Sequence, residues 1–229
     1  MYLSIHLATI INRPVTTGAN ETMVQPFFLS LNKTINRNHD MNKEELRKLY
    51  IHKRKALTAA QKMKADDLLL IQFQKLAIRI PSLIMTYAPL EKTNEFDPQL
   101  ITDYCYFKNP DQALFYPVVH PTAPNMLCVF VDDKTEFQPN RFGIPEPVNA
   151  TPMFPEEIEM VIVPLLAYSI SGQRVGYGKG YYDRFLAECS KDVIKIGFSY
   201  FAAEPLIEGT NEYDVKLDYC ISPEKIYRF

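Results

Sequence analysis

The sequence predicts an α/β fold in which helices cover both faces of a mostly parallel sheet. Short runs that are apolar on both faces recur along the chain with helical segments between them, which is typical of parallel strands. The length of 229 residues and the 47% of hydrophobic residues suit one globular domain with a sizeable core. We therefore predict a single domain over residues 41–229.

Residues 1–40 differ in pattern from the rest of the chain. Their short apolar patches, at 5–11 and 27–31, show no sustained helical or strand period. The first charged residue is Arg13, which lies after the first apolar patch, so a secretory signal is not supported. We interpret this stretch as a poorly ordered N-terminal extension or as the product of a wrongly assigned start, with Met41 opening the functional protein.

Two helices are predicted directly after Met41. Asn42 can cap the first helix, and Glu45 three residues later completes a capping box. Thr58 and Gln61 form a second box, and the helix that they open is expected to end before Pro81. The expected apolar positions are Leu46, Leu49, Tyr50 and Leu57 in the first helix and Met63, Leu69, Leu70, Phe73, Leu76 and Ala77 in the second.

Five strands and two more helices are predicted in the rest of the chain. The strands are expected at 83–88, 113–119, 127–131, 160–163 and 193–198, and the helices at 96–107 and 181–189. A turn at 121–125 precedes the run 127–131, so an antiparallel return is an open alternative for that strand.

Charge and composition exclude several functional classes. The formal net charge of -2 offers no overall attraction to nucleic acid or to anionic lipid. No apolar run approaches the ~20 residues that a membrane-spanning helix needs. Because no C-x-x-C pair occurs, we predict reduced thiols and no zinc or redox motif for the four cysteines, Cys105, Cys128, Cys189 and Cys220. We expect a cytoplasmic monomer with no nucleic-acid or membrane partner.

Glycines crowd into one loop that follows the apolar run 160–163. Four of them fall within nine residues, at Gly172, Gly176, Gly178 and Gly180. Without a Cβ, alternating glycines let backbone N–H groups converge on one anion, and the start of the next helix adds a partial positive charge. Arg174 and Lys179 supply full charges, so the loop predicts a phosphate-binding cradle, the alternative being a flexible loop with solvated cations. The pattern is neither a Walker nor a Rossmann motif.

Asp183 lies in the first turn of the helix predicted after this loop. A carboxylate there is favoured by the helix dipole alone, and beside bound phosphates it is also a candidate magnesium ligand. The residues by themselves leave both interpretations open.

A family resemblance extends over most of the chain. The segment GQRVGYGKGYYDRFL, at 172–186, resembles the signature of the 5-formyltetrahydrofolate cyclo-ligases, also called methenyltetrahydrofolate synthetases. Four further segments resemble the family in the same order: KEELRKLYIHKR at 43–54, NEFDPQLI at 94–101, FGIPEP at 142–147 and NEYDVKLDYCIS at 211–222. Residues 1–40 are unmatched. The resemblance implies a fold similar to that of sugar-phosphate isomerases and CoA-transferases.

The resemblance implies an enzyme that closes the formyl group of 5-formyltetrahydrofolate onto a neighbouring nitrogen. ATP would be consumed with Mg²⁺ as cofactor, and the products would be 5,10-methenyltetrahydrofolate, ADP and phosphate. A formamide oxygen is a poor leaving group, so phosphorylation of that oxygen would activate the carbon. Such a transfer needs positioning and charge neutralisation more than covalent help from the protein.

The resemblance also implies roles for individual residues. For ATP these are Lys43, Arg47, Arg174, Val175, Gly176, Tyr177, Gly178, Lys179, Gly180, Tyr181 and Tyr182. For the folate they are Glu95, Tyr177, Gly178, Lys179, Gly180 and Tyr181. Lys179 and Arg174 would be catalytic by neutralising developing charge. Mg²⁺ would bind to Asp183 and Asp214, with Asp218 as a nearby alternative to the latter.

Three features of these assignments come from spacing and from departures from the family. Lys43 and Arg47 are four residues apart, so both lie on one helical face. Tyr177 stands where some members carry arginine, which predicts aromatic stacking there instead of a charge contact. The spacing from Tyr87 to Glu95 is longer than in some relatives, so substrate contacts around Leu90 are left open.

Several assigned residues also have a plainer interpretation, and two other functions compete with the ligase. Lys43 and Arg47 would otherwise be solvated cations, Glu95 a helix-capping carboxylate and Asp214 a turn residue. A sugar-phosphate isomerase or CoA-transferase relative would need no ATP. A non-catalytic folate- or nucleotide-binding paralogue would typically have lost Lys179, Asp183 or Glu95, and all three are present.

Overall fold

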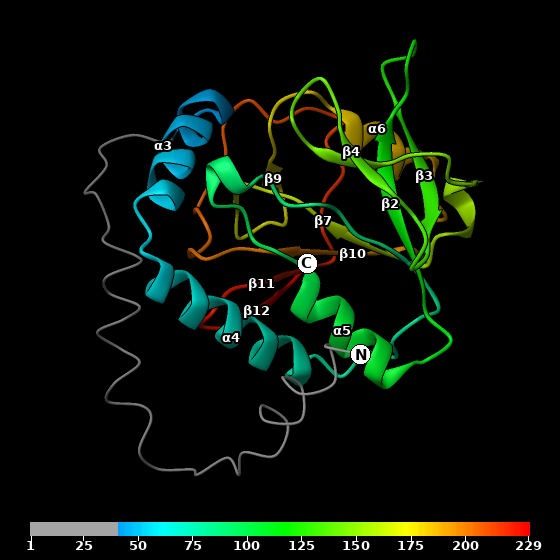
Figure 1. Cartoon of the computed structure of the whole chain (residues 1–229). Coiled ribbons are helices and arrows are strands. Elements are labelled where there is room, and N and C mark those ends of the chain that lie inside the picture. The colour runs from blue at the N-terminus through cyan, green and yellow to red at the C-terminus, as the bar shows by residue number, and fades with distance from the viewer. Residues whose placement is uncertain (1–40) are drawn as a thin grey trace. The chain divides into compact units, whose positions relative to one another are not determined.

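The computed structural model describes residues 41–229, which build an eight-stranded sheet (Figure 1). Across the sheet the strands follow the order β12-β11-β10-β7-β1-β2-β3-β6. Their bounds are β1 Leu83–Met85, β2 Ala113–Val119, β3 Met126–Val131, β6 Pro152–Met153, β7 Met160–Val163, β10 Ile194–Phe198, β11 Tyr219–Ile221 and β12 Ile226–Arg228. The interpretation of residues 1–40 and the proposed start at Met41 lie outside the described residues and stay predictions.

The central strands β11, β10, β7, β1 and β2 run parallel to one another. β12 and β3 are antiparallel to their neighbours, and β6 is antiparallel to β3. The predicted α/β fold with a mostly parallel sheet is therefore confirmed. For the run 127–131, the antiparallel alternative is the right one.

Within the described residues, four α-helices accompany the sheet: α3 Lys43–Lys55, α4 Ala59–Lys75, α5 Gln99–Lys108 and α6 Tyr181–Glu188. Both predicted capping boxes are present at the starts of α3 and α4. α5 begins later than predicted because Pro98 stands at its N-cap, and a residue before proline disfavours the helical conformation. Two short 3₁₀ turns, Glu91–Thr93 and Pro155–Glu157, complete the helical elements.

Helices cover both faces of the sheet, which explains why its central strands are mostly apolar. In Figure 1, α4 and α5 lie below the strands, and α3 and α6 lie above them. On the side of α4 and α5, Phe198 of β10 packs against Phe73 and stacks on Phe96 with 4.9 Å between ring centroids. On the other side, Phe185 of α6 belongs to one buried cluster with Val161 of β7. Strand side chains that point to either face of the sheet are thus removed from water.

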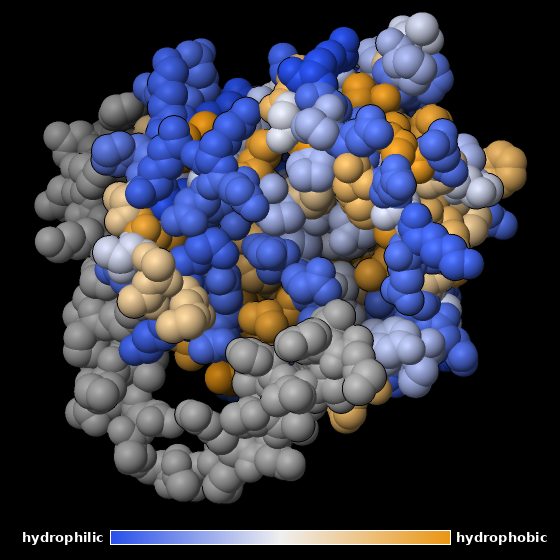
Figure 2. Space-filling model, in the orientation of Figure 1, coloured by the Kyte–Doolittle hydropathy of each residue, from blue (hydrophilic) through white to orange (hydrophobic). Residues whose placement is uncertain are grey.

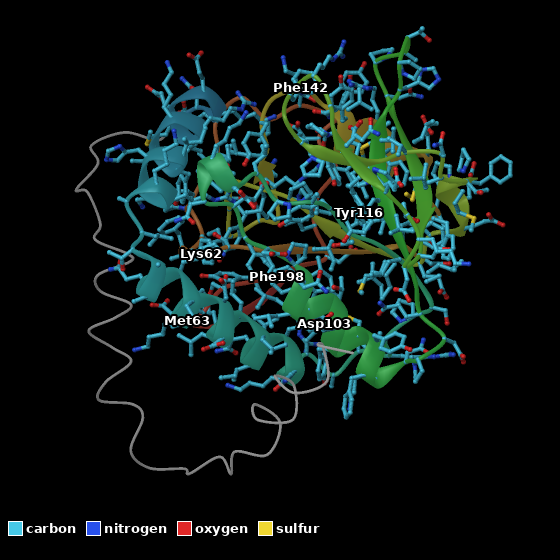
Figure 3. The ribbon with its side chains drawn as sticks, in the orientation of Figure 1. Lys62, Met63, Asp103, Tyr116, Phe142 and Phe198 are labelled. Atoms are coloured by element: carbon cyan, nitrogen blue, oxygen red, sulfur yellow. The ribbon has the colours of Figure 1, made fainter. Side chains whose placement is uncertain are left out.

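The predicted apolar stripe of α4 is wrong at Met63 and Ala77. Met63 is 66% exposed, and Figure 3 shows it on the outer side of the helix. The buried stripe instead passes through Ala65, Leu69 and Phe73 at intervals of four residues, and Met63 lies on a different face. Ala77 is exposed because the helix ends before it.

Two short antiparallel ribbons lie outside the sheet. β4 Phe137–Pro139 pairs with β5 Pro145–Pro147, and β8 Ala167–Tyr168 pairs with β9 Arg174–Val175. We did not predict them, because two or three residues are too few for a periodic pattern to show. They matter for function, since the first carries the turn 140–144 and the second leads into the glycine loop.

The surface and the cysteines agree with the expectations from composition. None of the helices within residues 41–229 is long and apolar enough to cross a bilayer. Figure 2 shows a mainly hydrophilic surface over α3, with apolar residues in smaller patches. All four cysteines are free thiols, as predicted, and Cys105, Cys128 and Cys220 are buried.

Candidate active site

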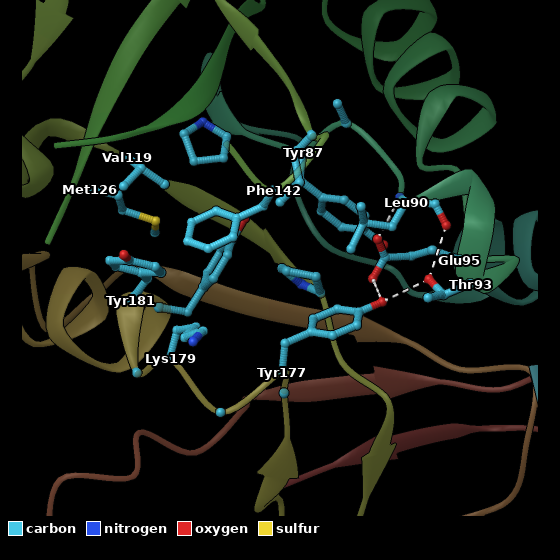
Figure 4. A pocket seen from close by; sticks show the side chains of 18 of the residues that line it. Tyr87, Leu90, Thr93, Glu95, Val119, Met126, Phe142, Tyr177, Lys179 and Tyr181 are labelled. Atoms are coloured by element: carbon cyan, nitrogen blue, oxygen red, sulfur yellow. Dashed lines mark hydrogen bonds between the residues drawn. The ribbon is translucent and has the colours of Figure 1, made fainter. Parts of the chain in front are cut away.

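A pocket of about 640 Å³ lies where the chain leaves the carboxyl ends of the central strands. Tyr87 follows β1, Pro164 follows β7, and both line the pocket. The lining also includes residues of α3, β2 and β3, the segment around the 3₁₀ turn Glu91–Thr93, the turn between β4 and β5, the glycine loop with the start of α6, and Asp214 (Figure 4). Ligands of open α/β sheets bind at this edge, so the fold places the pocket where a substrate site is expected.

The predicted site residues converge on this pocket, with one exception. The lining includes Lys43, Arg47, Glu95, Arg174, Gly176, Tyr177, Gly178, Lys179, Gly180, Tyr181, Tyr182, Asp183 and Asp214. Val175 does not line it: its side chain is fully buried, and its backbone pairs with Ala167 in the β8–β9 ribbon. The prediction of Val175 as an ATP contact is therefore not supported by its side chain, which anchors the loop in the core.

Between Gly176 and Gly180, two residues of the glycine loop need to lack a side chain. Gly178 has a φ of +86° and Gly180 a φ of +66°, a region that other residues rarely adopt. Gly180 is also the N-cap of α6, so the loop delivers the N-terminus of that helix to the pocket. The partial positive charge of the helix end faces the same space as the loop.

Helix α3 contacts the glycine loop through charged side chains. The Nε atom of Arg47 donates a hydrogen bond of 2.9 Å to the carbonyl of Gly176. Lys43, one turn earlier, forms an ion pair with Asp214. Both cations line the pocket, as the four-residue spacing predicted, so α3 contributes its charged face to the site.

A second ion pair joins Arg174 to Asp183. The Nη2 atom of Arg174 lies 2.8 Å from Oδ1 of Asp183, and the backbone N–H of Val215 donates to the same oxygen at 3.1 Å. Arg174 is only 8% exposed, and burial lowers its pKa, although the charge of Asp183 opposes that shift. Each of the two predicted metal-binding carboxylates is thus paired with a cation predicted to bind phosphate.

The donor set suits a magnesium ion that phosphates also hold. In the part of the chain that the structure describes, the hydrogen bonds of Asp183 and of Asp214 each use a single carboxylate oxygen, which leaves the other oxygen available. No group of three or more metal-binding side chains occurs among residues 41–229. Mg²⁺ commonly takes one or two protein carboxylates and completes its shell with phosphates and water. Asp218, the alternative ligand, lies elsewhere and pairs with Lys195 at 2.9 Å.

At the other end of the lining, Glu95 is buried in a hydrogen-bonded network (Figure 4). Its carboxylate accepts hydrogen bonds of 2.8 Å from the backbone N–H of Leu90 and 2.8 Å from the hydroxyl of Tyr177. The Oγ1 atom of Thr93 lies 3.2 Å from the hydroxyl oxygen of Tyr177. Burial raises the pKa of Glu95, which is 4% exposed, while the positive charge of Arg54 opposes the rise. The phenol of Tyr177 is therefore held by hydrogen bonds, and Leu90 shapes the network through its backbone.

Arg54 is a residue of this site that the sequence reasoning missed. Its Nη1 atom lies 3.5 Å from Oε1 of Glu95 and donates a hydrogen bond of 3.3 Å to the Tyr177 hydroxyl. A signal was present in the sequence, because Arg54 shares a helical face with Lys43 and Arg47 at spacings of eleven and seven residues.

The turn between β4 and β5 adds further residues that carried no predicted role. Figure 4 shows the ring of Phe142 projecting into the pocket between Tyr87 and Tyr181. The Nζ atom of Lys92 donates a hydrogen bond of 3.1 Å to the carbonyl of Phe142, and Nζ of Lys179 lies 5.9 Å from the centre of its ring. The resemblance had marked FGIPEP as a matching segment, but only the tertiary structure brings its aromatic ring into the site.

Comparison with known proteins gives one consistent result. A sequence model of the 5-formyltetrahydrofolate cyclo-ligase family matches residues 39–208. The 5-formyltetrahydrofolate cyclo-ligase of Mycoplasma pneumoniae is 27% identical over 197 residues, which are 80% of this chain and 100% of that protein. The enzyme of the same name from Escherichia coli is 26% identical over 174 residues, 69% of this chain and 93% of the relative. The structure of Aquifex aeolicus 5,10-methenyltetrahydrofolate synthetase superposes with a TM-score of 0.66 at 25% identity, covering 81% of this chain and 92% of that one.

Proposed function

The chain belongs to the 5-formyltetrahydrofolate cyclo-ligase family, and from that premise we propose that the pocket beside the glycine loop carries out the family's ATP-dependent reaction. The enzyme converts 5-formyltetrahydrofolate into 5,10-methenyltetrahydrofolate. The observation that carries the assignment of the site is the convergence of the predicted phosphate-binding and folate-binding residues on one cavity.

The chemistry requires the formyl oxygen to be turned into a leaving group. The γ-phosphoryl group of ATP is transferred to that oxygen, which releases ADP and leaves an iminophosphate. The neighbouring nitrogen then attacks the carbon and loses its proton, and phosphate departs with the oxygen. Catalysis of such a transfer depends on alignment and on neutralising the charge of the phosphoryl oxygens, more than on covalent participation of the protein.

The phosphate end of the pocket supplies this charge neutralisation. The glycine loop and the N-terminus of α6 offer backbone N–H groups, and Lys43, Arg47 and Arg174 surround them with positive charge. Lys179 differs from Lys43 and Arg174, because no ion pair engages it in the described part of the chain. We assign to Lys179 the neutralisation of charge that develops on the transferred group.

Asp183 and Asp214 are proposed to hold Mg²⁺ together with the phosphates of ATP. The ion supplies additional neutralisation of phosphate charge when it is bound. Both carboxylates line the pocket, and each has one oxygen outside the hydrogen bonds described above. The ion pairs with Arg174 and Lys43 hold the two carboxylates in position for this purpose.

The opposite end of the pocket is proposed to hold the pterin. The pterin ring offers N–H groups that can donate hydrogen bonds to the Glu95 carboxylate, and apolar side chains form the walls of this end of the pocket. These walls include Val119, Met126 and Phe142 (Figure 4). Tyr182 also lines the pocket, and its buried hydroxyl has no hydrogen-bond partner within residues 41–229.

The enzyme is proposed to work as a monomer. The residues assigned to the lining of the pocket come from one chain. Sedimentation analysis at assay concentration tests this, and a stable dimer would contradict it. The cytoplasmic location stays a prediction.

The decisive assay mixes the purified protein with 5-formyltetrahydrofolate and Mg-ATP near neutral pH and follows the near-ultraviolet absorbance of the methenyl product. A reaction without ATP is the control, because acid alone closes the ring. Growth of the absorbance band only with ATP is the expected result. Folded protein that binds ATP but forms no product would contradict the proposal and favour a non-catalytic paralogue.

A further inference from the structure

Arg54 is a buried cation whose place the reaction described above does not explain. It lies in the last turn of α3 and is 2% exposed. Removing a guanidinium from water costs several kcal/mol, so a buried arginine persists only where charges and hydrogen bonds compensate for the lost hydration. Its partners therefore indicate what the residue does.

Those partners come from three separate segments. One guanidinium nitrogen donates to the carbonyl of Leu165, just beyond β7, and the other faces Glu95 at 3.5 Å and Tyr177 at 3.3 Å. The backbone carbonyl of Arg54 also accepts a hydrogen bond of 2.9 Å from the side chain of Asn94, the neighbour of Glu95. Arg54 thus connects α3 to the segment with Asn94 and Glu95 and to the glycine loop at Tyr177.

We propose that Arg54 is a positioning residue for the folate half of the pocket, which holds the Glu95 carboxylate and the Tyr177 hydroxyl ready to receive the pterin. The proposal rests on the proposed function, because it takes Glu95 to be a folate contact. Arg54 does not line the pocket, so it acts through these two residues and not by touching a ligand.

The charges around Glu95 make Arg54 hard to replace. Among residues 41–229, the other titratable groups that face this carboxylate are hydroxyls: Tyr177 from the glycine loop, Tyr87 from the chain after β1 and Tyr182 from α6. Burial raises the pKa of each of these phenols, so they stay neutral at physiological pH. Arg54 is the cation of the set, and without it the buried carboxylate would be ionised only at higher pH.

The test compares Arg54→Met with Arg54→Lys in steady-state kinetics, with each substrate varied in turn from mildly acid to mildly alkaline pH. We expect Arg54→Met to raise the KM for 5-formyltetrahydrofolate about ten-fold or more, the loss typical of a charge-assisted hydrogen bond, with little change in the KM for ATP. The defect should shrink as the pH rises, because Glu95 then regains its charge. Arg54→Lys keeps a cation and should show the pH dependence of the wild type with a smaller rise in the folate KM.

Two controls separate positioning from mere support of the fold. In the double variant R54M/E95Q, the group that titrates is gone, so the pH dependence introduced by Arg54→Met should disappear. Lys48→Met removes an exposed cation from the same helix, where it pairs with Glu44, and should leave both KM values unchanged. Equal rises in both KM values at every pH, or a pH dependence that persists in the double variant, would overturn the proposal.

Failure of the proposed function can be told apart from failure of this inference. If the wild type makes no methenyl product, the proposed function fails, and equilibrium binding of 5-formyltetrahydrofolate to the wild type and to Arg54→Met then tests the inference. Equal affinity, or no binding to either protein, would overturn it. If Arg54→Met does not fold, Arg54→Lys decides: a folate KM equal to that of the wild type would refute the positioning role.

Discussion

The Cζ atom of Arg47 lies 3.1 Å from the place where a Cβ on Gly178 would stand. The arginine of the first helix therefore packs directly on the backbone of the glycine loop, far along the chain. This contact joins the two parts of the proposed phosphate site. A side chain at position 178 is disfavoured for two reasons: the backbone is left-handed there, and Arg47 lies close to the Cβ position.

Gly178→Ala is expected to raise the KM for ATP by on the order of ten-fold or more, because the new methyl group displaces Arg47 and shifts the loop. The matched control is Gly209→Ala. Gly209 also has a positive φ, +72°, but no atom lies within 4 Å of its Cβ position. Both variants should lose about 1–2 kcal/mol of unfolding free energy to backbone strain. Equal KM values for ATP in the two variants would contradict the role of the contact.

Lys179→Ala is expected to lower kcat by ~10²-fold or more, the loss typical of a removed transition-state contact. Lys191→Ala removes an exposed lysine just after α6 and serves as the control. Single-turnover measurements at saturating substrates separate the chemical step from binding. Activity near that of the wild type in Lys179→Ala would remove Lys179 from the mechanism.

Mg²⁺ is expected to bind firmly only when a nucleotide is present, because the protein offers two carboxylates and the phosphates must complete the site. Calorimetric titration of Mg²⁺ into the protein with and without ADP measures this directly. Asp183→Asn should weaken the nucleotide-dependent binding of Mg²⁺. The control variant Asp192→Asn, at an exposed position, should not. Tight binding of Mg²⁺ to the protein alone would refute the assignment.

Glu95 is expected to make the fold less stable as the pH rises from acid to neutral. Burial raises the pKa of Glu95 above its ordinary value of 4.5, so the folded chain keeps this proton to higher pH than the unfolded chain. Stability from that difference is present below the ordinary pKa and is lost as the pH rises through the folded pKa. Relative to the wild type, Glu95→Gln should therefore gain stability between acid and neutral pH. Urea unfolding of both proteins tests this, and a constant difference would contradict it.

The thiols are expected to react slowly in the folded protein. Burial raises the pKa of Cys105 and of Cys128 to about 12 and that of Cys189 to about 11, so little thiolate exists at mildly alkaline pH. Cys189 is half-buried and should be the first to be alkylated by iodoacetamide, as peptide mass analysis would show. In denaturant all four should react alike. Early labelling of Cys220 in native protein would contradict the structure.

Much of the fold was predictable because its signals are local. The two capping boxes predict the starts of α3 and α4. Strands such as β2 and β7 were predicted from runs of residues that are apolar on both faces. The short ribbons β4–β5 and β8–β9 were not predicted, because strands of two or three residues are too short to show a periodic pattern. Met63 was placed wrongly for another reason, since its apolar side chain faces away from the core.

The sequence by itself determined the chemistry that the site can perform. Alternating glycines beside arginine and lysine predict a phosphate-binding loop, and the family signature rests on those residues. Only the tertiary structure decided how the charges are paired and how strongly they act. It paired Lys43 with Asp214, placed Asp214 in the pocket and Asp218 outside it, and buried Arg54 beside Glu95. The strength of a charge depends on how much water packing removes around it, and packing is a property of the whole fold.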